Sequence, residues 1–80
     1  MSELLEAARA QIDAGDYKAA TKMLCKVEVL ARYDIDEARG LLELATAVRD
    51  HGGRRVHRDC DWLVMKAEET IRSFESAHVH

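Results

Sequence analysis

Apolar residues recur along this chain every three or four positions, and the recurrence is interrupted at three places. Such spacing lines up apolar side chains on one face of a helix, so the sequence predicts four helices. The expected helices run from about residue 2 to 14, from 17 to 32, from 35 to a break at 51–53, and from 54 to 76. Glycine marks the first and last interruptions, because it favours the conformations that end a helix.

Polar residues at the interruptions are of the types that cap helices. Ser2, Asp16 and Asp34 each precede an apolar periodic segment, where a side-chain oxygen accepts an N–H of the first helical turn. Glu37 follows Asp34 by three residues, and this spacing predicts a capping box. Gly15 is expected to end the first helix.

The apolar faces predict how the helices pack. The second helix carries its stripe on Tyr17, Ala20, Leu24, Val27 and Ala31, widened by Met23 and Leu30. The fourth helix carries its stripe on Val56, Cys60, Leu63, Ala67, Ile71 and Phe74. Gly40 lies inside the third helix, where it lowers helix stability and is expected to permit a close approach of another helix. The predicted fold is all-α: four antiparallel helices form two helical hairpins in a small bundle, as a single domain over residues 1–80.

Composition agrees with packed amphipathic helices. The 80 residues are 48% apolar and 34% charged, with no proline and a net charge of −3. A negative chain has no overall attraction to nucleic acid or to an anionic membrane. No apolar run reaches the roughly 18 residues that span a bilayer, and the acidic start MSELLEAARA is unlike a signal peptide. With only two cysteines, expected to be reduced thiols, these features predict a cytoplasmic protein.

The run Ala14–Ala20 (AGDYKAA) resembles the turn inside a tetratricopeptide repeat, the TPR family. In that family a Gly-Asp-Tyr turn joins the two helices of a repeat, and small residues lie where the helices cross. Ala8 and Ala20 match those small positions. The resemblance covers about residues 1–32. It implies a TPR-like helical hairpin and a role in protein binding. The third and fourth helices do not restate the pattern, and one repeat alone does not build the stacked groove of the family.

Residues that bind metals or catalyse reactions are few and poorly spaced. His57 and Cys60 lie three apart on one helix, but a structural zinc site needs four ligands. A second pair would have to come from His78 and His80, or from Cys25 on another helix. There is no glycine-rich phosphate loop, no nucleophile elbow and no His-Glu-x-x-His motif. We therefore expect no metal site, no cofactor and no enzymatic activity.

Four arginines cluster around the last glycine turn and the start of the fourth helix: Arg49, Arg54, Arg55 and Arg58. The backbone N–H groups of a helix start add positive potential there, so a phosphate, an acidic peptide or nucleic acid is a possible ligand. The alternative is a solvated turn whose arginines pair with nearby acids. Acidic residues further along the same helix, including Asp59 and Glu68, would repel phosphates.

Trp62 and Met65 fall outside the apolar stripe of the fourth helix. At 100° per residue they lie about 200° and about 140° from Cys60, which is the centre of that stripe. Either another part of the chain covers them, or the stems of Arg58 and Lys66 shield the tryptophan, or they remain free for a partner.

The last alternative favours a small protein-interaction or self-associating module, an adaptor or a homo-oligomer. Its expected partner-binding residues are Trp62, Met65, Arg55 and Arg58. The competing hypothesis is a small nucleic-acid-associated regulator that uses the arginine cluster.

Overall fold

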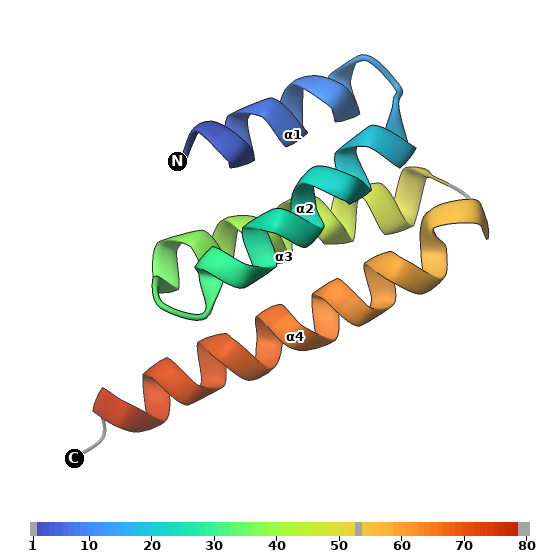
Figure 1. The fold of residues 1–80 in the computed structure, drawn as a ribbon. Coiled ribbons are helices and arrows are strands. Elements are labelled where there is room, and N and C mark those ends of the chain that lie inside the picture. The colour runs from blue at the N-terminus through green and yellow to red at the C-terminus, as the bar shows by residue number, and fades with distance from the viewer. Residues whose placement is uncertain (1, 53, 79–80) are drawn as a thin grey trace.

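The structure of the chain, a computed structural model, consists of helices joined by short turns (Figure 1). It describes residues 2–52 and 54–78, and the side chains of Arg55 and His78 lie outside that description. The helices within these residues are α1 (Glu3–Asp13), α2 (Tyr17–Ala31), α3 (Ile35–His51) and α4 (Arg54–His78). No strand occurs in the described part of the chain, which confirms the prediction of an all-α fold.

The first three helices begin at the capping residues that the sequence predicts. Ser2 Oγ accepts a backbone N–H of α1 at 3.3 Å, and Asp16 Oδ1 accepts one of α2 at 3.1 Å. Asp34 Oδ1 accepts two N–H groups of the first turn of α3. These bonds satisfy donors that have no partner inside the helix, so they fix where each helix starts.

The predicted capping box at the start of α3 is only half correct. Asp34 caps the helix, but its own N–H donates to the carbonyl of Ala31 at 3.4 Å. Glu37 instead accepts the hydroxyl of Ser2 at 2.8 Å. The start of α1 is thereby tied to the start of α3, because the two helices lie beside each other in the folded chain.

One hydrophobic core draws side chains from all four helices. Its largest fully buried members are Leu5, Leu24, Leu41, Leu63, Val27, Val48 and Cys60. Helices α2 and α3 form the middle of the bundle, with α1 on one side and α4 on the other (Figure 1). Among the described residues α1 and α4 make no contact with each other. Helix α4 therefore packs on its inner side only.

Two glycines have structural roles, one in the turn after α1 and one at a contact between helices. Gly15 has φ +80°, a left-handed conformation that favours glycine, and it ends α1 as predicted. Gly40 lies in α3 where a Cβ would come within 2.6 Å of Leu5 Cδ1. The expected close approach is thus confirmed, and it joins α1 to α3.

One expectation about the apolar stripes was wrong, and a second holds only in part. Leu30 is 48% exposed, because it lies about 120° around α2 from the buried Leu24. Phe74 is only half-buried, since α4 has 25 residues and continues beyond the ends of α2 and α3 (Figure 1). The core therefore covers the first two thirds of α4 and thins out towards its C-terminal end.

Candidate functional site

The side of α4 that faces away from the core carries two large apolar residues. Trp62 is 43% exposed and Met65 is 47% exposed, whereas the neighbouring Leu63 is fully buried. Arg58 and Glu69 are also exposed, and at 100° per residue all four fall within an arc of about 60°. We call these four residues, Arg58, Trp62, Met65 and Glu69, the outer strip of α4.

No other described helix packs over the outer strip, but the side chain of Lys66, from the same helix, partly shields it. The Nζ atom of Lys66 lies 6.0 Å from the centre of the Trp62 ring, at the outer limit of a cation–π contact. Lys66 also pairs with Glu69 at 3.7 Å. The sequence raised the alternative that the stem of Lys66 shields the tryptophan. This shielding is partial, and much of the indole remains in contact with solvent.

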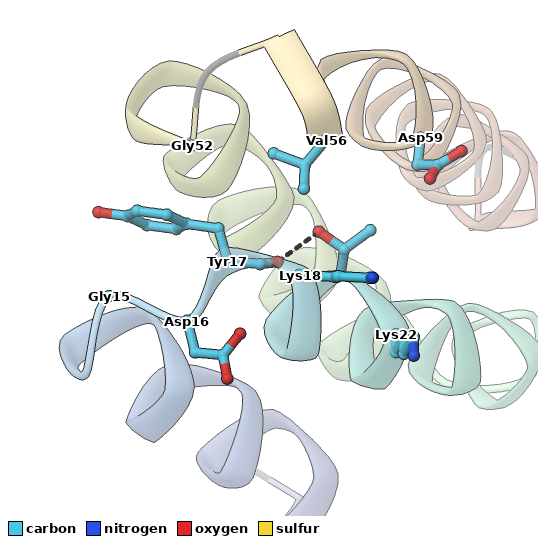
Figure 2. A pocket seen from close by; sticks show the side chains of 9 residues that line it. Gly15, Asp16, Tyr17, Lys18, Lys22, Gly52, Val56 and Asp59 are labelled. Carbon is cyan, nitrogen blue, oxygen red and sulfur yellow. Dashed lines mark hydrogen bonds between the residues drawn. The ribbon is translucent and has the colours of Figure 1, made fainter.

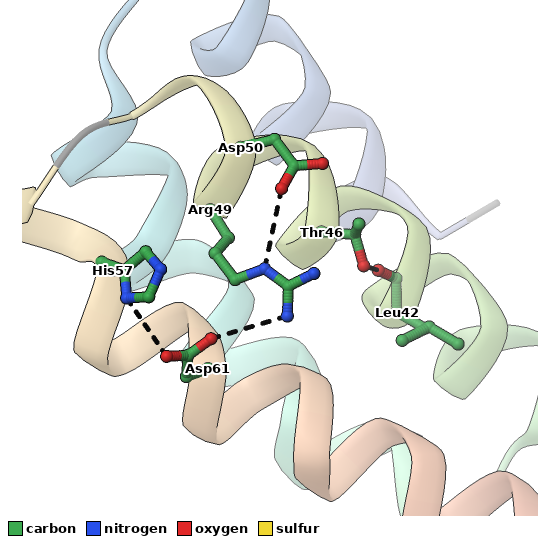
Figure 3. Close-up of polar contacts among 6 residues, drawn as sticks. All are labelled: Leu42, Thr46, Arg49, Asp50, His57 and Asp61. Atoms are coloured by element: carbon green, nitrogen blue, oxygen red, sulfur yellow. Dashed lines mark hydrogen bonds and ion pairs between the residues drawn. The ribbon is translucent and has the colours of Figure 1, made fainter.

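The predicted arginine cluster is partly neutralised. Arg49 contacts Asp61 at 3.5 Å and Asp50 at 3.7 Å (Figure 3). Nδ1 of His57 lies 3.1 Å from the other carboxylate oxygen of Asp61. Asp61 thus lies between a cation of α3 and a histidine of α4, and it lowers the positive potential around them.

The remaining arginines of the cluster are exposed or outside the description. Arg54 and Arg58 are exposed and have no ion-pair partner among the described residues. The side chain of Arg55 lies outside the described residues. Arg58 belongs to the outer strip, whereas Arg49 lies beside Asp61 between α3 and α4. The cluster is therefore divided, and among its arginines with described side chains Arg58 alone lies beside the exposed tryptophan.

A hollow of about 530 Å³ lies where the start of α2 meets the start of α4 (Figure 2). Its charged lining residues are Asp16, Lys18, Lys22 and Asp59, two of each sign. The hydroxyl of Thr21 donates to the carbonyl of Tyr17 at 2.7 Å, so this polar group of the wall already has a partner. A lining with balanced charge selects neither anions nor cations, and the hollow is a weaker candidate than the outer strip.

The two cysteines are not activated nucleophiles. Cys60 is buried with its Sγ 3.7 Å from the hydroxyl of Thr21. Burial raises the pKa of Cys60, and the nearby Asp59 carboxylate raises it further. Partial desolvation, followed by the charges of Asp59 and Glu28, raises the pKa of Cys25 as well. Both thiols therefore stay protonated at neutral pH, whereas reactive cysteines have a lowered pKa.

A second exposed apolar group lies at the end of α2 and was missed by sequence reasoning. It consists of Val29, Leu30 and Tyr33. Beside this end of α2, Arg32 and Phe74 line a shallow hollow of about 290 Å³ under the projecting part of α4. The sequence does place Leu30 and Tyr33 three residues apart near a helix end, which is compatible with a shared exposed surface. Leu30 was expected to be buried because it widens the apolar stripe of the second helix.

The described residues, 2–52 and 54–78, contain neither a metal-binding cluster nor a helix that could cross a membrane. No group of three or more histidine, cysteine and acidic side chains there could hold a metal ion. His57 pairs with Asp61, and Cys60 points into the core towards Thr21. No helix in this part of the chain is both long enough and apolar enough to cross a membrane.

Comparisons with protein-family models, with curated proteins and with solved structures found no match for the chain.

Proposed function

We propose that this chain is a small helical protein-interaction module that binds its partner through the outer strip of α4 and has no catalytic activity. The observation that carries the proposal is the exposure of Trp62 and Met65 side by side, opposite the core face of the same helix. Leaving a tryptophan in water forgoes the free energy of burying a large apolar ring. Tryptophan is also among the residues most enriched at the energetic centres of protein interfaces.

The proposed architecture is a pair of antiparallel hairpins, α1 with α2 and α3 with α4, of which the first is TPR-like. In its support, α1 packs on α2 and α3 packs on α4, and each pair is joined by a short turn. Ala8 and Ala20, the small residues of the family resemblance, are both fully buried. Small side chains let two helices approach closely, as the resemblance requires.

Protein binding is favoured over nucleic-acid binding. A nucleic-acid site needs several arginines or lysines that are free to contact phosphates. Arg49 is already paired with Asp50 and Asp61, and the chain carries a net charge of −3. Arg58 fits the protein-binding proposal better, because it lies beside Trp62 and both arginine and tryptophan are enriched at protein interfaces.

Site-specific photo-crosslinking tests the proposal. A photoreactive amino acid replaces Met65 in the full chain, expressed in its native cells, and a matched variant carries it in place of the exposed Arg39 of α3. We expect a protein adduct from position 65, lost on Trp62→Ala, and none from position 39. If position 65 gives no adduct, or both positions give the same adducts, the outer strip is not a protein-binding surface.

A further inference from the structure

The four residues of the outer strip follow the spacing of a seven-residue repeat, and arginines, Arg55 and Arg72, occupy the next position at each end. The steps from Arg58 to Trp62, Met65 and Glu69 are four, three and four residues, which is the spacing of the contact seam of a two-stranded coiled coil. The core stripe of α4 is on the opposite side of the helix, so both sides carry apolar residues. Helix α4 thus has one face for its own bundle and a second face with the pattern of a helix-pairing seam.

The order of residues along the seam is self-complementary. A positive residue, Arg58, stands at one end, two apolar residues are in the middle, and a negative residue, Glu69, stands at the other end. If a second α4 runs antiparallel about a twofold axis between residues 63 and 64, Trp62 lies opposite Met65 of the second copy. In the same register Arg58 lies opposite Glu69 of the second copy, and each pairing occurs twice by symmetry.

We infer that the occupant of the outer strip is a second copy of this chain, paired through α4 in antiparallel orientation. The inference rests on the proposed function and names its partner. In a parallel pair Arg58 would face Arg58 and Glu69 would face Glu69, so like charges would repel at both ends. Within the outer strip the antiparallel register converts both repulsions into attractions, and this complementarity favours a second copy as the occupant.

Not every charge around the seam favours this pairing. One seam position beyond each end of the outer strip, Arg55 comes opposite Arg72 of the second copy, and these like charges repel. On one flank Lys66 comes near Asp59 of the second copy, an attractive pair. On the other flank Asp61 comes near Glu68 of the second copy. Within each chain, however, Asp61 is already paired with Arg49 at 3.5 Å, and Glu68 with Arg72 at 3.9 Å. These internal pairs reduce the repulsion across the second flank. By the same argument, the internal pair of Lys66 with Glu69 at 3.7 Å reduces the attraction between Glu69 and Arg58 of the second copy.

The expected dimer is weak. Its apolar centre holds two residues from each chain, whereas a stable interface buries about 800 Å² per partner. One helix contact of this kind corresponds to a dissociation constant on the order of micromolar or weaker. Association is therefore expected to depend on concentration and not to be constitutive.

Charge reversal tests the register. Solution mass is measured by sedimentation equilibrium over a concentration series for the wild type, Arg58→Glu, Glu69→Arg and the double variant. A reductant is present because Cys25 is exposed, and the exposed Arg39→Glu on α3 is the matched charge control. We expect the wild type to approach twice its 9.0 kDa chain mass. Each single reversal weakens the dimer about tenfold or more, the double variant restores it, and the control leaves it unchanged.

Two other outcomes overturn the inference. If the wild type stays at 9.0 kDa at every concentration, the chain does not pair with a second copy. The crosslinking result at position 65 then decides whether the outer strip binds a different protein. If the wild type dimerises and neither single charge reversal weakens the dimer, the two copies pair through another surface or in parallel orientation. Circular dichroism of each variant confirms that it is folded, as expected for substitutions at exposed positions.

Discussion

The contact between Gly40 of α3 and Leu5 of α1 allows the packing of the bundle to be tested with one methyl group. Gly40→Ala favours the helix by about 1 kcal/mol, because alanine has the higher helix propensity. The added Cβ, however, would lie 2.6 Å from Leu5 Cδ1 and 3.3 Å from Leu5 Cδ2. Leu5 is fully buried, so its side chain has no solvent to move into. Overpacking of this kind costs about 1–3 kcal/mol, which outweighs or cancels the propensity gain.

A double-mutant cycle isolates the clash. Leu5→Ala removes both Cδ atoms, so Gly40→Ala should then stabilise the protein by about 1 kcal/mol instead of destabilising it by up to about 2 kcal/mol. Unfolding of the four proteins by urea is followed by far-UV circular dichroism. The osmolyte TMAO is present throughout, because Leu5→Ala alone costs about 2–5 kcal/mol. If Gly40→Ala has the same effect in both backgrounds, the two residues do not touch and the packing of α1 on α3 is wrong.

Three further predictions follow from burial and charge. Leu63→Ala should lower the unfolding free energy by about 2–5 kcal/mol, whereas Trp62→Ala at low protein concentration should lower it by less than about 1 kcal/mol; similar losses in thermal melts would place Trp62 in the core. Folding raises the pKa of the Cys60 thiol above its ordinary value of 9.0. At pH values above about 9 the unfolded chain therefore loses this proton more readily than the folded protein does, and the free energy of unfolding falls as the pH rises. Chemical denaturation as a function of pH should show a shallower fall for Cys60→Ala, and an unchanged fall would contradict the assignment. Binding to DNA or RNA, measured by fluorescence anisotropy, should be weak at physiological salt; tight binding that weakens steeply with salt and on Arg54→Ala or Arg58→Ala would support the nucleic-acid hypothesis instead.

Most of the secondary structure could be predicted from the sequence because the deciding signals are local. The spacing of apolar residues located each helix to within one or two residues, and Ser2, Asp16 and Asp34 capped the helices as expected. The orientation of Trp62 away from the core also followed from local geometry, since 100° per residue fixes where a side chain points once Cys60 is known to be buried.

What the sequence did not reveal depends on contacts between distant segments. Glu37 accepts a hydrogen bond from Ser2 because α1 lies beside α3, and no local rule contains that neighbour. Leu30 looked buried because it widens an apolar stripe, but the arc of α2 that the other helices cover is narrower than the stripe. The arginine cluster looked uniform in sequence, whereas Asp61 pairs with Arg49 across two helices and divides it.

The exposure of Trp62 to a partner is the central claim, and fluorescence measures it directly because this is the only tryptophan in the chain. Emission and quenching by acrylamide are recorded over a protein dilution series, with the solution mass of each sample. At low concentration we predict the red-shifted, easily quenched emission of a solvated indole. As the mass rises, the emission should shift to the blue and quenching should fall. A tryptophan already blue-shifted and protected in the monomer would contradict the account, because Trp62 would then belong to the chain's own core.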